Sequence, residues 1–172
     1  LIAERENAAR VQASFLVSSL PLIAKEKRDD YIAKFGQLNL SRIRVYDQDG
    51  RKILDSFAGR EPTYVFRDPN REPLSKIAAR WIDVLFDFLV GAAKLEHYVE
   101  PAKDIPSAWP EIDAATPANA ASKVRFAPDL THMISAAATV RDGGLTVLTT
   151  SNERDIRLFV RAERFNVGMF FL

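Results

Sequence analysis

Apolar residues recur at mixed spacings of three and four residues along the start of the chain, interrupted by Glu6. The members of this stripe are Ile2, Ala9, Ala13, Leu16, Leu20 and Ile23. The spacing predicts a helix from about Ile2 to Ser19 that ends or kinks at Pro21, whose ring obstructs the preceding turn. We expect Leu16 and Leu20 to lie in the seam of a coiled coil that joins two copies of the chain.

Two further helices are expected in the first half of the chain. The first covers residues 22–35, carries charged side chains toward solvent and stops at Gly36. The second begins near Pro73, where a missing N–H costs nothing. Its broad apolar face should pack on a sheet. This face consists of Ile77, Trp81, Val84, Leu85, Phe88, Leu89 and Ala92.

Two β-hairpins are predicted between these helical segments and the C-terminus. Residues 42–46 alternate polar and apolar side chains, a turn follows at 47–50, and residues 51–56 return. Residues 132–140 and 145–150 form the second hairpin. The proline-rich residues 59–73 and 100–125 predict loops, with a short strand at 63–66 as an alternative for the first. The whole pattern predicts an α+β fold with a central antiparallel sheet.

The chain closes with a helix that begins on a polar cap near residues 151–152. Ile156, Phe159 and Val160 recur on its apolar side, and residues 167–172 are apolar except for one glycine. We expect this segment to continue into a membrane helix of about 20 apolar residues. Residues 1–172 are then a single domain held between two membrane helices, both trimmed away. A soluble protein whose terminal helices pack on each other is equally compatible with the composition.

Charge and composition narrow the functional classes. Among 172 residues, 24 Lys and Arg face 23 Asp and Glu, which leaves a net charge of +1. This balance argues against a dedicated nucleic-acid binder, which needs a basic excess to follow phosphates. The absence of cysteine excludes disulfides, thiol catalysis and Cys-based zinc sites. No internal segment is long and apolar enough to be a complete membrane span.

Residue patterns typical of catalysis are missing. The chain contains no phosphate-binding glycine loop and no hydrolase or kinase signature. His97 and His132 are the only histidines and stand in different segments, so no histidine metal cluster is expected. Asp47 and Asp49 resemble part of a calcium loop, but the required bidentate glutamate does not follow. We therefore expect no catalytic residue, no metal and no cofactor in this chain.

Several blocks, taken in order, resemble one family. They are residues 41–50 with 53–56, the aromatic-Pro-Glu element at 109–112, residues 131–137, and residues 145–150 followed by 155–156 and 160–164. Their order and spacing are similar to those of the sensor region of ChvG/ExoS-type membrane histidine kinases. The turn at 141–144 is shorter than the family's, and residues 59–100 match no block.

The resemblance implies a PAS-like (PDC/Cache-type) sensor fold in the periplasm, between two helices in the cell inner membrane. It implies that the full-length protein is a histidine kinase of a two-component system, which passes phosphate to a response regulator. It also implies responses to acid or envelope conditions, and control by a periplasmic regulatory protein in some members. The same input domain is compatible with a chemoreceptor, a cyclic-nucleotide synthase or a soluble binding protein.

Three inputs are open at the level of sequence. A protein partner would dock on the loops at 59–71 or 100–125. Direct pH sensing would use His97, His132 or buried carboxylates, because an unperturbed histidine titrates near 6.5. A small anionic ligand would be held beside the sheet by Arg44, Arg67 or Arg125. The alternative is an ordinary surface or sheet-edge residue for the histidines and a solvated side chain for the arginines.

Overall fold

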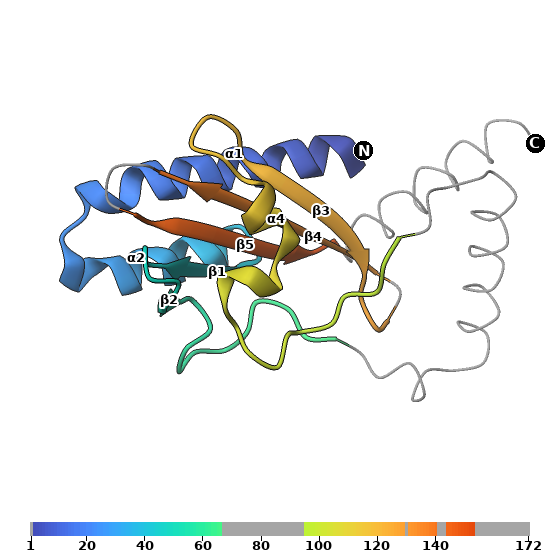
Figure 1. The fold of residues 1–172 in the computed structure, drawn as a ribbon. Helices are drawn as coiled ribbons and strands as arrows, with labels where there is room; N and C mark the ends of the chain where they lie inside the picture. The colour runs from blue at the N-terminus through green and yellow to red at the C-terminus, as the bar shows by residue number, and fades with distance from the viewer. Residues whose placement is uncertain (1, 67–94, 130, 141–143, 154–172) are drawn as a thin grey trace, which may run out of the picture.

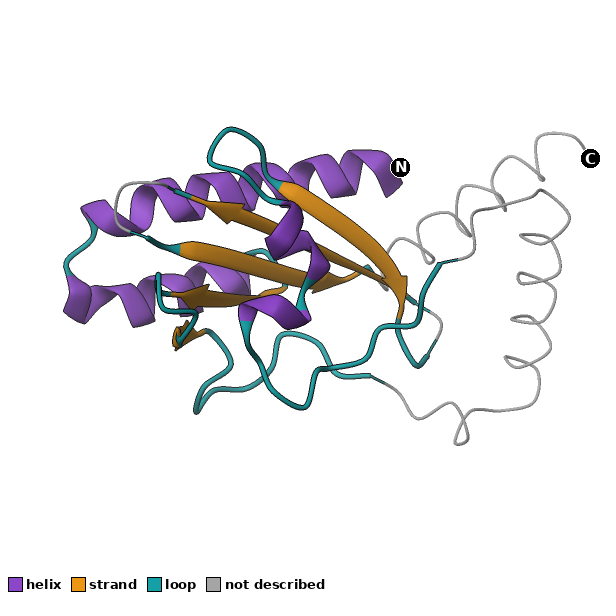
Figure 2. Cartoon of the chain, in the orientation of Figure 1, coloured by secondary structure: helices purple, strands orange, loops and turns teal. Residues whose placement is uncertain are grey.

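The computed structural model describes residues 2–66, 95–129, 131–140 and 144–153 (Figure 1). These residues form an α+β fold, as predicted, in which helices cover both faces of an antiparallel sheet. Figure 2 shows α1 (Ile2–Ser19) and α2 (Lys25–Leu38) behind the strands, and the short α4 (Pro110–Ala114) in front of them.

The five strands join into one sheet. They are β1 (Ser41–Tyr46), β2 (Lys52–Asp55), β3 (Ala121–Phe126), β4 (His132–Thr139) and β5 (Thr146–Asn152), in the order β2-β1-β5-β4-β3. Both predicted hairpins are confirmed, since β1 pairs with β2 and β4 with β5. The hairpins meet where β1 pairs with β5, from Ser41 opposite Ser151 to Tyr46 opposite Thr146.

The predicted loop at residues 100–125 is wrong in part, because it contains η3 (Pro106–Ala108), α4 and most of β3. Two of the prolines that suggested a loop, Pro106 and Pro110, stand in the first turns of η3 and α4, where the missing N–H would have no helical partner. β3 gives a weak sequence signal because it is a sheet edge in which only Arg125 is buried. Residues 63–66 form no strand.

The second helix also differs from its prediction. After η1 (Leu20–Leu22), α2 runs through Gly36 and ends at Leu38. A Cβ at Gly36 would lie 2.7 Å from the carbonyl oxygen of Ser41, so the glycine is needed where α2 meets β1 and does not cap the helix. The chain turns at Leu40, whose φ is 50°.

Alternation along the strands divides the buried side chains between two cores. The core on the α1 side includes Ala9, Ala13, Leu16, Leu20, Ile43, Val45, Ile134 and Val147. The core on the α4 side includes Tyr46, Tyr98, Trp109, Met133, Ala137 and Leu148. The central strands β1, β5 and β4 therefore contribute to both cores, as period-2 side-chain geometry requires.

Leu16 and Leu20 do not form a seam with another chain. Both are fully buried in the α1-side core, where α1 packs on β4 and β5 of its own chain. The helical period was read correctly, but the partner of the stripe is the sheet. The outward residues of α1 include Val11 and Phe15, which are 60% and 53% exposed.

Two predictions lie outside the described residues: the helix beginning near Pro73, and the C-terminal helix with Ile156, Phe159 and Val160. Within the described ranges, no helix is long and apolar enough to cross a membrane.

Replacing Leu16 with alanine should lower the free energy of unfolding by about 2–5 kcal/mol, because it leaves a cavity between α1 and the sheet. Val11→Ala is the matched control on the same helix and should change stability by less than about 0.5 kcal/mol. Urea denaturation measures both. If Leu16→Ala instead dissociated an oligomer and left the free energy of unfolding unchanged, the intrachain role of Leu16 would be contradicted.

Candidate functional site

The α4-facing side of the sheet carries a closed cycle of six charged side chains, which we call the ion ring. Its members alternate in sign around the cycle, and they are Arg42, Asp55, Lys52, Asp104, Arg44 and Glu100. Strands β1 and β2 supply four of them, and the irregular segment 95–105 supplies Glu100 and Asp104. The ring therefore joins residues more than 40 positions apart.

One half of the ring is centred on Asp55. Its two carboxylate oxygens accept from Nε and Nη2 of Arg42 at 3.0 and 2.7 Å. Lys52 Nζ donates to Asp55 at 2.9 Å and to Asp104 at 2.7 Å. The Arg42 guanidinium also lies 5.1 Å from the ring centre of Phe57, in a cation–π contact.

The other half is centred on Arg44, whose side chain is 0% exposed. Nη2 of Arg44 donates to Glu100 Oε1, which also accepts from Arg42 Nη1 at 2.9 Å. Nε of Arg44 lies 3.1 Å from Asp104 Oδ2, but no hydrogen bond forms, so this contact is an ion pair only. Thr150 Oγ1 accepts from Nη1 at a long 3.4 Å, and the guanidinium lies 4.8 Å from the centre of the Trp109 ring.

A row of aromatic rings borders the ion ring. Successive centroids are 5.4, 5.7, 5.7 and 6.2 Å apart along Phe57, Tyr64, Phe66, Tyr98 and Trp109. Their polar atoms meet the charges: Tyr98 donates to Glu100 at 2.6 Å, and Trp109 Nε1 donates to Asp104 at 3.1 Å. Tyr46 also donates to Asp104, at 2.6 Å. The row thus combines apolar surface with hydroxyl donors.

The electrostatics of the ring stabilise its ionised form. Burial alone would raise the pKa of Asp55, but hydrogen bonds from Arg42 and Lys52 outweigh it and hold the pKa well below its usual range. Burial would raise the pKa of Asp104 as well, but hydrogen bonds from Lys52 and Tyr46 lower it overall. Burial and the hydrogen bond to Asp104 raise the pKa of Tyr46, which therefore stays protonated.

A second buried ion pair fixes α4 to the sheet. Arg125 donates through both terminal nitrogens to the two oxygens of Glu111, at 3.1 and 2.8 Å, and Nη1 reaches Ser135 Oγ at 2.7 Å. Burial would raise the pKa of Glu111, but the hydrogen bond from Arg125 lowers it overall. This pair orients the helix that follows Trp109.

The structure separates the predicted ligand-binding arginines. Arg44 lies in the ion ring, and Arg125 is paired with Glu111 some strands away. Arg67 lies outside the described residues. Neither described arginine is solvated, so the alternative of an ordinary surface charge is wrong for both.

The two histidines lie on either side of Phe126. Phe126 is opposite His132 in the β3–β4 pair and opposite His97 in an isolated parallel bridge. Its ring centroid is 5.1 Å from that of His132, and His97 is exposed. Two strand spacings place the histidine backbones about 10 Å apart. Among the described residues, no group of three His, Cys, Asp or Glu could hold a metal ion.

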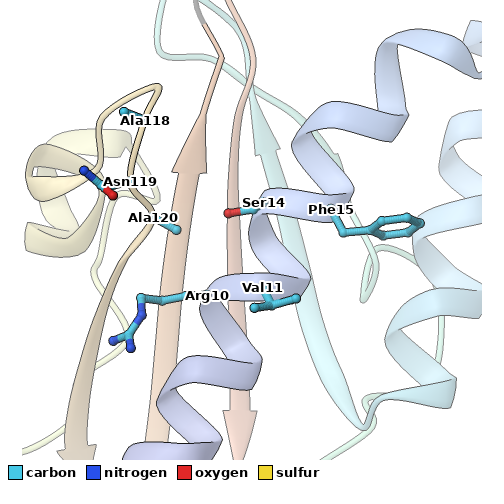
Figure 3. Close-up of a pocket in the computed structure, with 7 residues that line it drawn as sticks. All are labelled: Arg10, Val11, Ser14, Phe15, Ala118, Asn119 and Ala120. Atoms are coloured by element: carbon cyan, nitrogen blue, oxygen red, sulfur yellow. The ribbon is translucent and has the colours of Figure 1, made fainter.

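A groove also lies between α1 and the turn before β3, on the other layer of the molecule. It has a volume of about 480 Å³ and is lined by Arg10, Val11, Ser14, Phe15, Ala118, Asn119 and Ala120. Figure 3 shows these side chains on either side of the groove. Arg10 is the only titratable group in this lining and already donates to Ser122 at 2.9 Å. The lining of the groove therefore has few groups that could bind or activate a ligand.

Sequence reasoning missed the acidic half of the ion ring. Arg42 and Arg44 stand two positions apart in a strand, which is a readable sign that both guanidiniums share one face. Asp55 is also on the returning strand of the predicted hairpin. Glu100 and Asp104 gave no signal, because they belong to an aperiodic segment whose position depends on the fold.

Comparison with known proteins identified no matching family model, no similar curated protein and no similar solved structure.

The lowered pKa values of Asp55, Asp104 and Glu111 predict how stability depends on pH. A carboxylate whose pKa is lower in the folded state contributes stability above its unfolded pKa, about 4, and loses that contribution as pH falls through the folded value. Urea denaturation should therefore show no loss from these groups between pH 7 and about pH 5, and a decline below about pH 4.5.

The Asp104→Asn variant tests how much Asp104 contributes to this loss of stability at acid pH, because it removes one of the three carboxylates. The variant should be less stable at pH 7 and should have a shallower acid slope. A loss of wild-type stability between pH 7 and 5.5 that disappears in Asp104→Asn would contradict the lowered pKa of Asp104.

Proposed function

We propose that this chain is the PAS-like, extracytoplasmic input domain of a membrane sensor histidine kinase. The sequence resemblance supports this proposal, and the α+β layout with a central antiparallel sheet is compatible with it. The chain itself is not proposed to be an enzyme. In this proposal, the domain converts a periplasmic stimulus into a change in the position of its terminal segments. That change controls a cytoplasmic kinase, which passes phosphate to its response regulator.

The observation that carries the proposal is the attachment of segment 95–105 to the sheet by the ion ring. Between residues 99 and 104, no described backbone hydrogen bond reaches the sheet, and Glu100 and Asp104 make the connection with their side chains. We propose that this attachment has two arrangements, closed and released. A sensor needs two arrangements that a stimulus stabilises differently.

The ring also connects to the strand that leads toward the C-terminal segment. Arg44 lies opposite Leu148 in the β1–β5 pair and donates to Thr150 of β5. At the end of β5, the Glu153 carboxylate lies 3.8 Å from Arg5 near the start of α1. A shift of β1 relative to β5 would therefore reach both ends of the described chain. We propose that it changes the relative position of these ends in a homodimer whose contacts exclude Leu16 and Leu20.

The flanking coding sequence gives the simplest check. The proposal expects an apolar segment of about 20 residues on each side of this chain, and a histidine kinase module after the second. A chemoreceptor or cyclase module in that place would keep the sensor assignment and change the output. A reading frame without any flanking apolar segment would contradict the membrane-sensor proposal.

Autophosphorylation of the full-length protein in membrane vesicles tests the role of the ion ring. Lys52→Gln removes one cation of the ring and should change the basal rate of phosphate incorporation by about fivefold or more, which is a typical size of coupling between sites. Arg51→Gln is the matched control, because Arg51 is 77% exposed and pairs only with Asp49 among the described residues. Equal rates in the two folded variants would refute the ring as the sensing element.

A further inference from the structure

Glu100 differs from every other member of the ion ring in its exposure. Its side chain is 44% exposed, whereas the other five range from 0% to 29%. The neighbouring Val99 is 76% exposed, and Tyr98 is anchored by its backbone N–H to Phe126 at 2.6 Å. The chain can therefore turn outward after Tyr98 and remove Glu100 without opening either core.

The position that Glu100 fills requires an anion. Its Oε1 atom accepts from both Arg42 and Arg44, two like charges that repel each other without it. Without Glu100 the ring keeps three cations, Arg42, Arg44 and Lys52, and two anions, Asp55 and Asp104, so one positive charge is left. Arg44 is the cation most affected, because it is fully buried and its Nε has no hydrogen bond.

We infer that the Glu100 side chain occupies an anion site of the sensor, and that a small monocarboxylate is the ligand class that replaces it between Arg42 and Arg44. The carboxylate of Glu100 stands in for that of the ligand: one oxygen accepts from two guanidiniums and the other from the Tyr98 hydroxyl. Planar guanidinium groups suit this geometry. The inference rests on the proposed sensor function only for the claim that binding carries a signal.

The aromatic row indicates what the ligand carries besides its charge. Tyr98, whose hydroxyl donates to Glu100, follows Tyr64 and Phe66 in the aromatic row, and Tyr64 also shares a hydrogen bond of 2.9 Å with Thr150. A ligand with an apolar or aromatic body would cover these rings once residues 99–101 move away. Benzoate is therefore expected to bind better than acetate.

Competition between Glu100 and the ligand explains how binding would act on the fold. A tethered carboxylate next to its site has an effective concentration in the millimolar range. The apparent dissociation constant of the ligand equals its intrinsic value divided by the fraction of molecules in which Glu100 has left the site. A bound ligand in turn releases Glu100, so segment 99–103 loses its main attachment to β1, while Asp104 stays on Lys52 and Tyr46.

Calorimetric titration of the purified chain with sodium benzoate and sodium acetate, at pH 7.5 and low salt, tests the site. Glu100→Gln keeps the shape of the side chain and removes its charge, so this variant should bind benzoate at least tenfold more tightly than the wild type. Glu96→Gln is the matched control, because Glu96 is in the same segment and pairs with Lys123 outside the ring. It should behave as the wild type does.

A second substitution keeps the test independent of folding effects. Arg42→Gln in the Glu100→Gln background should abolish benzoate binding, and thermal unfolding establishes that each variant is folded. The inference is overturned if folded Glu100→Gln binds neither carboxylate, or if Glu96→Gln gains the same affinity. Equal affinities for acetate and benzoate would overturn the role of the aromatic row. These outcomes concern binding to the isolated chain, so they are separate from the autophosphorylation and flanking-sequence tests of sensor function.

Discussion

Burial of the Arg44 guanidinium is the constraint on which the α4-facing layer depends. An ionised side chain that is removed from water must be paired, because an isolated buried charge is far too costly. Arg44 stands in the middle of a β1 strand whose inner neighbours, Ile43 and Val45, are fixed in the α1-side core. Its side chain therefore has to point to the opposite face, and counter-charges have to come from elsewhere in the chain.

Those counter-charges determine the course of segment 95–105. Glu100 reaches Arg44 from one side and Asp104 from another, and Trp109 covers the guanidinium. Lys52 then balances the two aspartates, which leaves three cations and three anions in the ring. The irregular backbone of residues 99–105 is thus specified by side-chain electrostatics, whereas Glu96 and Tyr98 are held to Phe126 by backbone hydrogen bonds, as helices and strands are. The proposed movement of the segment on a local change of charge rests on this difference.

The same distinction decides what could be predicted from the sequence. The N-terminal helix and both hairpins follow from periods of 3.6 and 2, which are local properties of the chain. The interpretation of Leu16 and Leu20 failed because periodicity identifies a buried stripe and not its partner. Gly36 was misread for a similar reason, since a glycine at a helix–strand contact and a glycine at a helix end look alike in sequence. Arg44 is recognisable in the sequence as a cation in the middle of a strand, whereas Glu100 and Asp104 are defined only by three-dimensional proximity.

For the proposed sensor function, the properties of the ring favour competition by an anion over direct titration as the input. Asp55 and Asp104 have lowered pKa values because cations and hydrogen-bond donors surround them, so both stay ionised at mildly acidic pH. Asp104 is also held by Tyr46 and Trp109, which makes it a fixed part of the layer. One phenol and two guanidiniums donate to Glu100, and all three could donate equally well to another carboxylate. The bonds of Glu100 are therefore the most easily replaced in the ring. They attach the exposed part of the segment, which a ligand arriving from solvent meets first.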